Sequence, residues 1–270
     1  GCGEKRVINM LKICFKERKL LFELAKNDVK SRFSSSVLGA AWTVMQPLIN
    51  MLVIWLVFQA GFKSSNLEGD IPFIVWYMPA FLSWNLFSES VSQATNSIQE
   101  YSYLVKKVNF SVEIIPAIKI VSNTLIHLFF IAFIIFVNLC YGRLPNFYYL
   151  QVIYYAVCCM AISLAIGLLT SAVTPFTSDV ANIVSIIIQT GFWVTPIFWD
   201  PSQLTKGAQV LIRLNPIYYI CNGYRDCFVY QIPFYAHRVN TLYFWGITIV
   251  LWLIGSRTFN KAKQHFDDVL

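Results

Sequence analysis

The residues best suited to chemistry in this sequence lie along one face of a predicted helix. Polar side chains recur there at helical spacing, at Asn85, Glu89, Ser92 and Asn96. Residues four, seven and eleven positions apart share one face of an α-helix. The opposite face is apolar and consists of Trp84, Phe87, Val91, Ala94 and Ile98. A carboxylate on a helix at membrane depth normally faces a cavity or a partner, so this pattern predicts a polar conduit or a subunit interface. In the alternative interpretation, the second half of the helix projects into the cytoplasm.

Sequence patterns of enzymes and metal sites are missing from the chain. There is no GxxxxGK[ST], GxSxG or HExxH motif, and no Cys or His pair has metal-ligand spacing. We therefore predict no catalytic residue and no metal site. His127 lies alone in an apolar segment, where a functional role and a hydrogen-bonded packing role are both open. Cys221 and Cys227 are six residues apart, and we favour free thiols over a disulfide.

The composition identifies an integral membrane protein. Hydrophobic residues make up 57% of the 270-residue chain and charged residues only 13%, whereas a soluble domain carries about 25% charged residues. The net charge of +7 is concentrated near the start, since nine of the 21 Lys and Arg residues precede residue 33. This placement beside apolar segments favours membrane orientation over nucleic-acid binding as its cause.

Six segments are apolar enough and long enough to be predicted as transmembrane helices. They are residues 37–60, 71–95, 115–140, 150–174, 180–199 and 239–257. An even number of crossings places both termini on one side, and the excess of basic residues places that side in the cytoplasm. We expect an all-α, multi-pass membrane protein with both termini in the cytoplasm and with residues 37–270 as its transmembrane domain.

Two flanking regions complete the predicted architecture. Residues 1–36 alternate leucines with lysines and arginines at helical spacing, which predicts an amphipathic helix on the cytoplasmic membrane surface. Residues 200–235 are apolar and aromatic but are interrupted by Pro and Gly, which favours short re-entrant helices before the last span. Pro47 lies inside the first predicted span, where we expect it to kink the helix and shape the cytoplasmic mouth of a conduit.

Two motifs resemble those of a known family, the membrane subunits of ABC-2 type exporters of polysaccharides. The first motif has the pattern R-x(5)-L-G-x-x-W-x(4)-P, at Arg32, Leu38, Gly39, Trp42 and Pro47. The second is Asn215-Pro216 followed by Arg225 nine residues later. The resemblance covers nearly the whole chain, and the stretches LVKKVNFSVEIIPAIKI and TPIFWD look most similar to the teichoic acid branch of this family.

The resemblance implies a transport complex rather than an enzyme. It implies a homodimer that pairs with two copies of a separate ABC ATPase subunit, which would bind the ATP and Mg²⁺, so that this chain itself needs no cofactor. It also implies a lipid-linked polysaccharide substrate, such as a teichoic acid or O-antigen on an undecaprenyl diphosphate-type lipid. The resemblance implies the bacterial cytoplasmic membrane as the location, and no nucleic-acid partner is expected.

The same resemblance assigns roles to particular residues. Residues of about 100–112 would couple the chain to the ATPase, and those of about 200–235 would form the outer gate. The predicted coupling residues are Glu100, Tyr103, Lys106 and Lys107. The predicted residues of the substrate conduit or gate are Arg32, Trp42, Trp76, Trp84, Asn85, Phe87, Glu89, Tyr218, Tyr219 and Arg225. Aromatic walls would let sugar rings slide, and Arg225 would meet either a phosphate or the adjacent Asp226.

Two other functions remain open at this stage. The chain could belong to an ABC-2 exporter of drugs or smaller lipids, which the aromatic set Trp42, Trp76, Trp84 and Tyr219 would help to distinguish. A membrane enzyme acting on lipid-linked sugars would need clustered acids or histidines, and here the acids are scattered. The sequence names neither the polymer nor the type of cell envelope.

Overall fold

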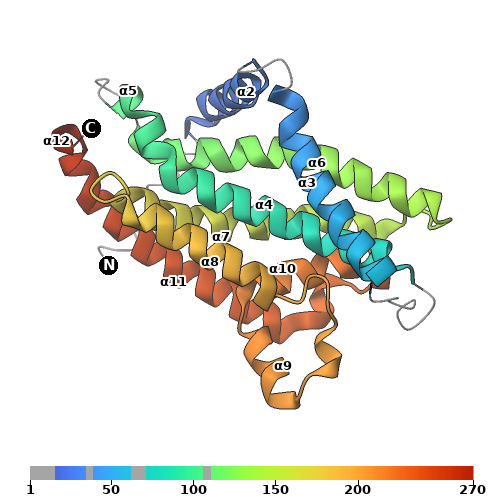
Figure 1. Ribbon diagram of the computed structural model, residues 1–270. Coiled ribbons are helices and arrows are strands. Elements are labelled where there is room, and N and C mark those ends of the chain that lie inside the picture. The colour runs from blue at the N-terminus through green and yellow to red at the C-terminus, as the bar shows by residue number, and fades with distance from the viewer. Residues whose placement is uncertain (1–15, 35–38, 62–70, 106–110, 270) are drawn as a thin grey trace.

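A computed structural model of the chain describes residues 16–34, 39–61, 71–105 and 111–269 (Figure 1). Helices account for almost all of these residues, so the prediction of an all-α protein is confirmed. Each of the six predicted transmembrane segments corresponds to a helix. The third prediction, residues 115–140, matches α6 (Ile115–Cys140) at both ends.

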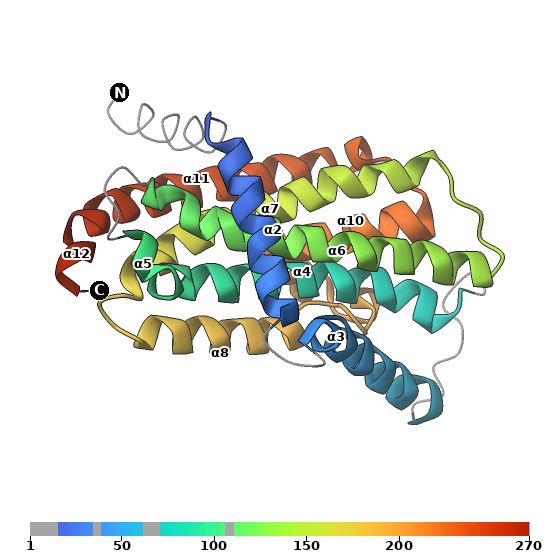
Figure 2. The ribbon, with the colours of Figure 1, turned by 90° about the horizontal axis from the view of Figure 1, so that it is seen from above.

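Five long helices run side by side and form a bundle (Figures 1 and 2). They are α4 (Phe73–Glu100), α6, α7 (Gln151–Val173), α8 (Asp179–Val194) and α11 (Arg238–Ala262). Helix α4 packs against α6, α7 and α8, and α7 packs in turn against α11. Short elements join the helices or end the chain, and they are α5 (Ser102–Val105), η2 (Val112–Ile114), η3 (Phe147–Leu150), η7 (Lys263–His265) and α12 (Phe266–Val269).

Four helical segments in the described part of the chain are long and apolar enough to cross a membrane. They are Ala41–Gln59, Val112–Cys140, Phe147–Val173 and Phe234–His265, and they make the chain a multi-pass membrane protein. Helix α8 has 16 residues, which span about 24 Å of a hydrocarbon core about 30 Å thick. Helix α4 is long enough but too polar. Six crossings therefore remain a prediction.

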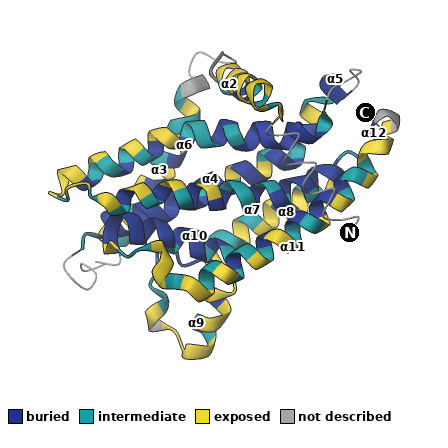
Figure 3. Ribbon diagram, turned by 180° about the vertical axis from the view of Figure 1, so that it is seen from behind, coloured by how far each residue is buried: buried dark blue, intermediate teal, exposed yellow. Residues whose placement is uncertain are grey.

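The polar composition of α4 follows from its central position. Figure 3 shows α4 largely in the colour of buried residues, and its buried set runs from Phe73 to Ile98. A helix that packs against α6, α7 and α8 exposes little surface to lipid. Polar side chains on such a helix face protein or a cavity, and that arrangement avoids the cost of contact with hydrocarbon.

The first two described helices lie outside the bundle. Helix α2 (Arg18–Ser34) crosses over α6 (Figure 2), where Ala25 packs against Ile114 and Ile118. Helix α3 (Gly39–Leu56) continues into the π-helical turn η1 (Val57–Gly61) and leans away from the bundle. Only 11% of its apolar stretch is buried inside the chain, against 56% for α7. The predicted location of α2 on the membrane surface is not tested by these contacts.

The interrupted region before α11 folds into short helices, as its Pro and Gly residues predict. They are η4 (Pro201–Gln203), α9 (Lys206–Arg213), α10 (Pro216–Arg225), the π-helical turn η5 (Asp226–Tyr230) and η6 (Phe234–His237). Asn215 caps α10 by accepting a hydrogen bond from the backbone N–H of Ile217, and Pro216 occupies the first turn. Helix α9 projects from the bundle on the side away from α2 (Figure 1). That these short helices enter the membrane and return on the same side remains a prediction.

Candidate functional site

The two predicted faces of α4 are both present. Asn85 and Asn96 are half-buried and Glu89 and Ser92 are exposed, whereas the apolar face opposite them is buried. The helix therefore turns its amide and carboxylate groups away from the packed core. Two cavities border this polar face, and both are lined by Asn50, Asn85 and Glu89. Together they form one polar groove.

The first cavity, which we name the inner cavity, has a volume of about 370 Å³. Its walls come from α3, α4 and α6, with Arg32 of α2 at one end. The lining consists of Arg32, Trp42, Thr43, Gln46, Pro47, Asn50, Asn85, Leu86, Glu89, Gln93, Asn123, Ile126, His127 and Phe130. Five of these side chains are amides, while the only charged ones are an arginine and a glutamate. Such a surface donates and accepts hydrogen bonds in many directions with little net charge.

Three buried polar atoms around the inner cavity have no hydrogen-bond partner among the described residues. They are Nδ2 of Asn123, Nδ1 of His127 and Oε1 of Gln93. The second polar atom of these side chains does have a partner. His127 Nε2 lies 3.0 Å from the Tyr224 hydroxyl, and Gln93 Nε2 donates a hydrogen bond to Glu89 at 2.9 Å. Buried polar atoms are normally paired, so these three atoms are unsatisfied polar groups in residues that line the cavity.

The second cavity, which we name the lateral cavity, continues the groove between α3, α4 and α8 and measures about 450 Å³. Aromatic side chains form much of its wall, namely Phe81, Trp84, Phe192 and Trp193. The Trp84 and Phe192 rings pack 6.2 Å apart, centroid to centroid. Because α3 is loosely packed, the groove lies at the edge of the chain rather than at its centre. The groove thus changes from an amide-rich wall to an aromatic one.

A cluster of charged groups fixes α2 beside the inner cavity. The buried Asp28 carboxylate accepts hydrogen bonds from Lys119 Nζ at 2.8 Å and the Tyr101 hydroxyl at 2.7 Å, and it also pairs with Arg32. Arg32 donates as well to Asn123 Oδ1 at 2.9 Å. Burial raises the pKa of Asp28, but the hydrogen bonds and the positive charges of Lys119 and Arg32 outweigh burial and hold the pKa below its usual value. The arginine at the cavity end is thereby held in place.

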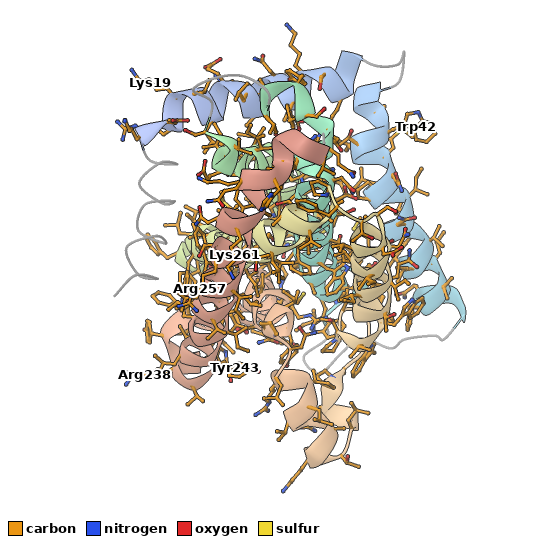
Figure 4. All side chains as sticks on the ribbon, turned by 90° about the vertical axis from the view of Figure 1, so that its left-hand side faces the viewer. Lys19, Trp42, Arg238, Tyr243, Arg257 and Lys261 are labelled. Carbon is orange, nitrogen blue, oxygen red and sulfur yellow. The ribbon has the colours of Figure 1, made fainter. Side chains whose placement is uncertain are left out.

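Five of the predicted conduit residues come together in the groove. Arg32, Trp42, Asn85 and Glu89 line the inner cavity, and Trp84 lines the lateral cavity. Figure 4 shows Trp42 projecting outward from α3, and its side chain is 55% exposed. Their transport role remains a prediction, but their common location is a finding.

The other predicted residues lie elsewhere. Phe87 is buried beside Trp84, with ring centroids 5.6 Å apart, and lines neither cavity. Arg225 is fully buried and stacks over the Trp76 ring at 3.6 Å. It donates to the carbonyl oxygens of Trp76 at 3.3 Å and Ile197 at 2.5 Å.

The residues around Arg225 form a second polar group. Its neighbour Asp226 pairs with His237 rather than with Arg225, and Tyr218 and Tyr219 line a separate small cavity beside that pair. Cys221 and Cys227 are free thiols, as the sequence favoured.

The predicted coupling segment is described only in part. Glu100 bonds Lys119 Nζ at 2.5 Å, and Tyr103 is 58% exposed. Lys106 and Lys107 lie outside the described residues. Sequence reasoning missed Asn50, Gln93 and Asn123 as groove residues. The spacing of Asn123 and His127, four apart in an apolar helix, was a signal that could have paired them.

The arrangement defines a class of protein: a multi-pass helical membrane protein with a polar and aromatic groove along a central helix. Among the described residues no group of three His, Cys, Asp or Glu side chains could hold a metal ion. A family model described as ABC-2 type transporter matches residues 19–229, and the chain belongs to that family.

Curated relatives match almost the full length of the chain. One, from Myxococcus xanthus, is 24% identical over 266 residues, covering 96% of this chain and 98% of the relative. Another, from Klebsiella pneumoniae, is 26% identical over 253 residues, covering 93% and 95%. Both are named O-antigen export system permease protein RfbA.

Proposed function

We propose that the chain is the membrane subunit of a transporter that exports a lipid-linked cell-envelope polysaccharide across the cytoplasmic membrane. The observation that carries the proposal is the groove, in which an amide-rich inner cavity adjoins a lateral cavity with aromatic walls. Amides bond sugar hydroxyls, and aromatic faces pack on sugar rings without fixing one position. Curated relatives named as O-antigen export permeases support the same substrate class.

Different parts of the groove would bind different parts of the substrate. Arg32 lies at the end of the inner cavity near the proposed cytoplasmic mouth, where its guanidinium, already paired with Asp28, would donate hydrogen bonds to the lipid diphosphate. The amides of Asn50, Asn85 and Asn123 would then bond the first sugars. Beyond them Trp84 and Phe192 would form a surface along which the polymer slides.

A second copy of the chain is part of the proposal. Helices α3 and α8 border the lateral cavity and leave apolar side chains exposed, among them Leu52 and Leu56 on α3 and Ile186 and Ile187 on α8. Such rows contact lipid as readily as a partner helix, so it is the open polar groove between them that a second copy would close. We propose that two copies of a separate ABC ATPase bind the cytoplasmic side, hold ATP and Mg²⁺, and drive the cycle. Both termini would lie in the cytoplasm.

A biochemical reconstitution tests this function. The purified chain alone should hydrolyse no ATP, whereas co-expression with its cognate ATPase should give a four-subunit complex that moves lipid-linked polymer across proteoliposomes when ATP is present. ATP hydrolysis by the chain alone, or failure to form a complex with the ATPase, contradicts the proposal. Polymers of teichoic acid and O-antigen type, tested in parallel, identify the substrate. Covalent change of the lipid-linked polymer would instead favour the membrane enzyme.

The export of drugs or smaller lipids is the second candidate. Trp76 and Trp84 are buried, so replacing them would disturb packing. Trp42 is the most informative aromatic residue because it is 55% exposed and lines the inner cavity. Under our proposal, Trp42→Ala impairs polymer export. Normal polymer export with loss of drug resistance in this variant favours the second candidate.

A further inference from the structure

A separate polar cavity lies at the opposite end of the bundle from α12, between α7, α9, α10 and the start of α11. We name it the end cavity. Its volume is about 150 Å³, and it shares no lining residue with the groove. Figure 4 places Arg238 and Tyr243, at the start of α11, toward the end of the molecule that carries α9. In the proposed orientation this end faces the outside of the membrane.

Two buried groups form part of the wall of the end cavity. Asp226 is 1% exposed, and its Oδ2 accepts a hydrogen bond from Asn222 at 3.2 Å and lies 3.1 Å from His237 Nε2. Tyr155 is 0% exposed, and its hydroxyl lies near the Tyr219 hydroxyl but makes no hydrogen bond of normal geometry to a described residue. The ring of Tyr155 packs directly on Gly223, where an added Cβ would lie 2.0 Å from it. Packing therefore fixes at this cavity a buried hydroxyl that has no well-formed hydrogen bond within the protein.

The charges around the end cavity indicate an uncharged ligand. Arg213 supplies one positive charge and Asp226 one negative charge, and His237 is already engaged with that carboxylate. The amides of Asn222 and Asn240 add donors and acceptors. An anion would meet the buried carboxylate of Asp226, and a cation would meet Arg213. A neutral molecule rich in hydroxyl groups uses both kinds of hydrogen-bonding group.

The size of the end cavity limits the ligand further. Since one water takes about 30 Å³ of liquid, the cavity has room for about five waters. This is the scale of one sugar ring and not of an oligosaccharide held along its length. We propose that the end cavity binds a single neutral sugar unit, whose hydroxyls bond Asp226, the Tyr155 hydroxyl and the Asn240 amide. This binding site is distinct from the groove, and the proposed function bears only on where the sugar comes from.

Saturation-transfer difference NMR on the full chain in lipid nanodiscs tests the site. The probes are methyl glycosides of neutral hexoses and of an N-acetylhexosamine, with glucuronate and glucosamine as charged counterparts. We expect saturation transfer to at least one neutral glycoside. Tyr155→Phe should weaken its binding about threefold to tenfold, the effect of one lost hydrogen bond. Asn240→Ala, at a half-buried position near the start of α11, should have a similar effect.

Two control variants separate the end cavity from other causes. Tyr77→Phe removes another buried hydroxyl that has no partner among the described residues and lies outside the end cavity, so it should not change binding. Asn96→Ala removes an amide of α4 that lines neither the groove nor the end cavity, and it should also leave this signal in place. Equal binding by the wild type and by both end-cavity variants overturns the proposal, as does a preference for a charged counterpart or the absence of any neutral binder.

A further arm identifies the source of the sugar. A linear oligosaccharide of the bound sugar is compared with its methyl glycoside. Equal binding supports a unit of a polymer as the ligand, whereas exclusion of the oligosaccharide supports a free sugar. Because none of these measurements requires the ATPase or transport, failure of the export proposal and failure of the sugar site give different results.

Discussion

The groove and the α10 region both bury polar groups, but they satisfy them in different ways. In the α10 region, Arg225 stacks on Trp76 and donates to two backbone carbonyls, all within the protein. In the groove, His127 and Asn123 each use one atom within the protein and leave another without a partner among the described residues. The contacts of Arg225 stabilise the fold, whereas the unpaired atoms of the groove mark a surface for a ligand.

The two regions also differ in how tightly their helices are packed. Helix α10 and turn η5 are buried against α4 and α7, and Asn215 and Arg225 at the two ends of α10 hold Thr195 and Ile197. These two hydrogen bonds hold the segment that follows α8 in place. Helix α3, by contrast, is mostly exposed along the groove. Substitutions in the α10 region should therefore reduce stability, and substitutions in the groove should mainly reduce transport.

The largest expected effect is at Arg225. Arg225→Leu should lower the free energy of unfolding by about 4 kcal/mol, because two buried carbonyls lose a charged donor and Trp76 loses its cation–π partner. Arg225→Lys should recover only part of this, since an ammonium cannot reproduce the planar fork of the guanidinium. Thermal unfolding in detergent and the yield of folded protein in membranes measure both variants. Wild-type stability of Arg225→Leu would remove the distinction between the two regions.

The next effect concerns the cluster that docks α2 beside the groove. Asp28→Asn should weaken the docking of α2 by about 3 kcal/mol, because Lys119 and Arg32 lose a shared buried carboxylate. Hydrogen exchange of α2 amides measures the change. Glu23→Gln is the control, since Glu23 pairs with Lys26 on the exposed side of α2 at 3.7 Å and should contribute little.

Strong acid should also weaken the docking of α2. Asp28 has a lowered pKa in the folded chain. Its contribution is therefore complete above about pH 4, the ordinary range of an aspartate, and is lost as the pH falls through the lowered pKa. The difference between wild type and Asp28→Asn should stay constant from neutral pH to about pH 5 and shrink under stronger acid. A difference that grows on acidification contradicts the proposed ion pairing.

A smaller effect sharpens the contrast in packing. Gly223→Ala should lower the free energy of unfolding by about 2 kcal/mol, because the new Cβ would lie 2.0 Å from the Tyr155 ring. Gly246→Ala in α11 is the matched control, since nothing lies within 4 Å of its added Cβ. There the better helix propensity of alanine should raise stability by up to about 1 kcal/mol. Equal changes at both glycines would show that α10 is not tightly packed on α7.

The sequence predicts the helices and the faces of α4 better than it predicts their partners. Apolar length was enough to place α6 at residues 115–140, and helical spacing separated Asn85 and Glu89 from the buried face. Periodicity describes one helix at a time, however. The contacts of Arg225 with Ile197 and Trp76 join residues 28 and 149 positions apart, and nothing in the local pattern specifies them.

The same limit explains the groove residues that the sequence did not identify. Asn123 and Gln93 become groove residues because α6 and α4 face α3 across a cavity, which is a property of packing between helices. The polarity of α4 predicted a polar conduit or a subunit interface, and two cavities border its polar face. Its burial within one chain explains why its composition alone does not qualify it as a membrane span.

The smallest expected effect on stability tests the groove itself. Asn85 and Asn96 lie on the same face of α4, but only Asn85 borders the two cavities. Asn85→Leu should change the free energy of unfolding by less than about 0.5 kcal/mol, because Asn85 is only half-buried and its side chain makes no hydrogen bond to another described residue. Its polymer export should fall about tenfold through the loss of one substrate hydrogen bond. Asn96→Leu should leave export unchanged, and equal export by both variants would place the polymer outside the groove.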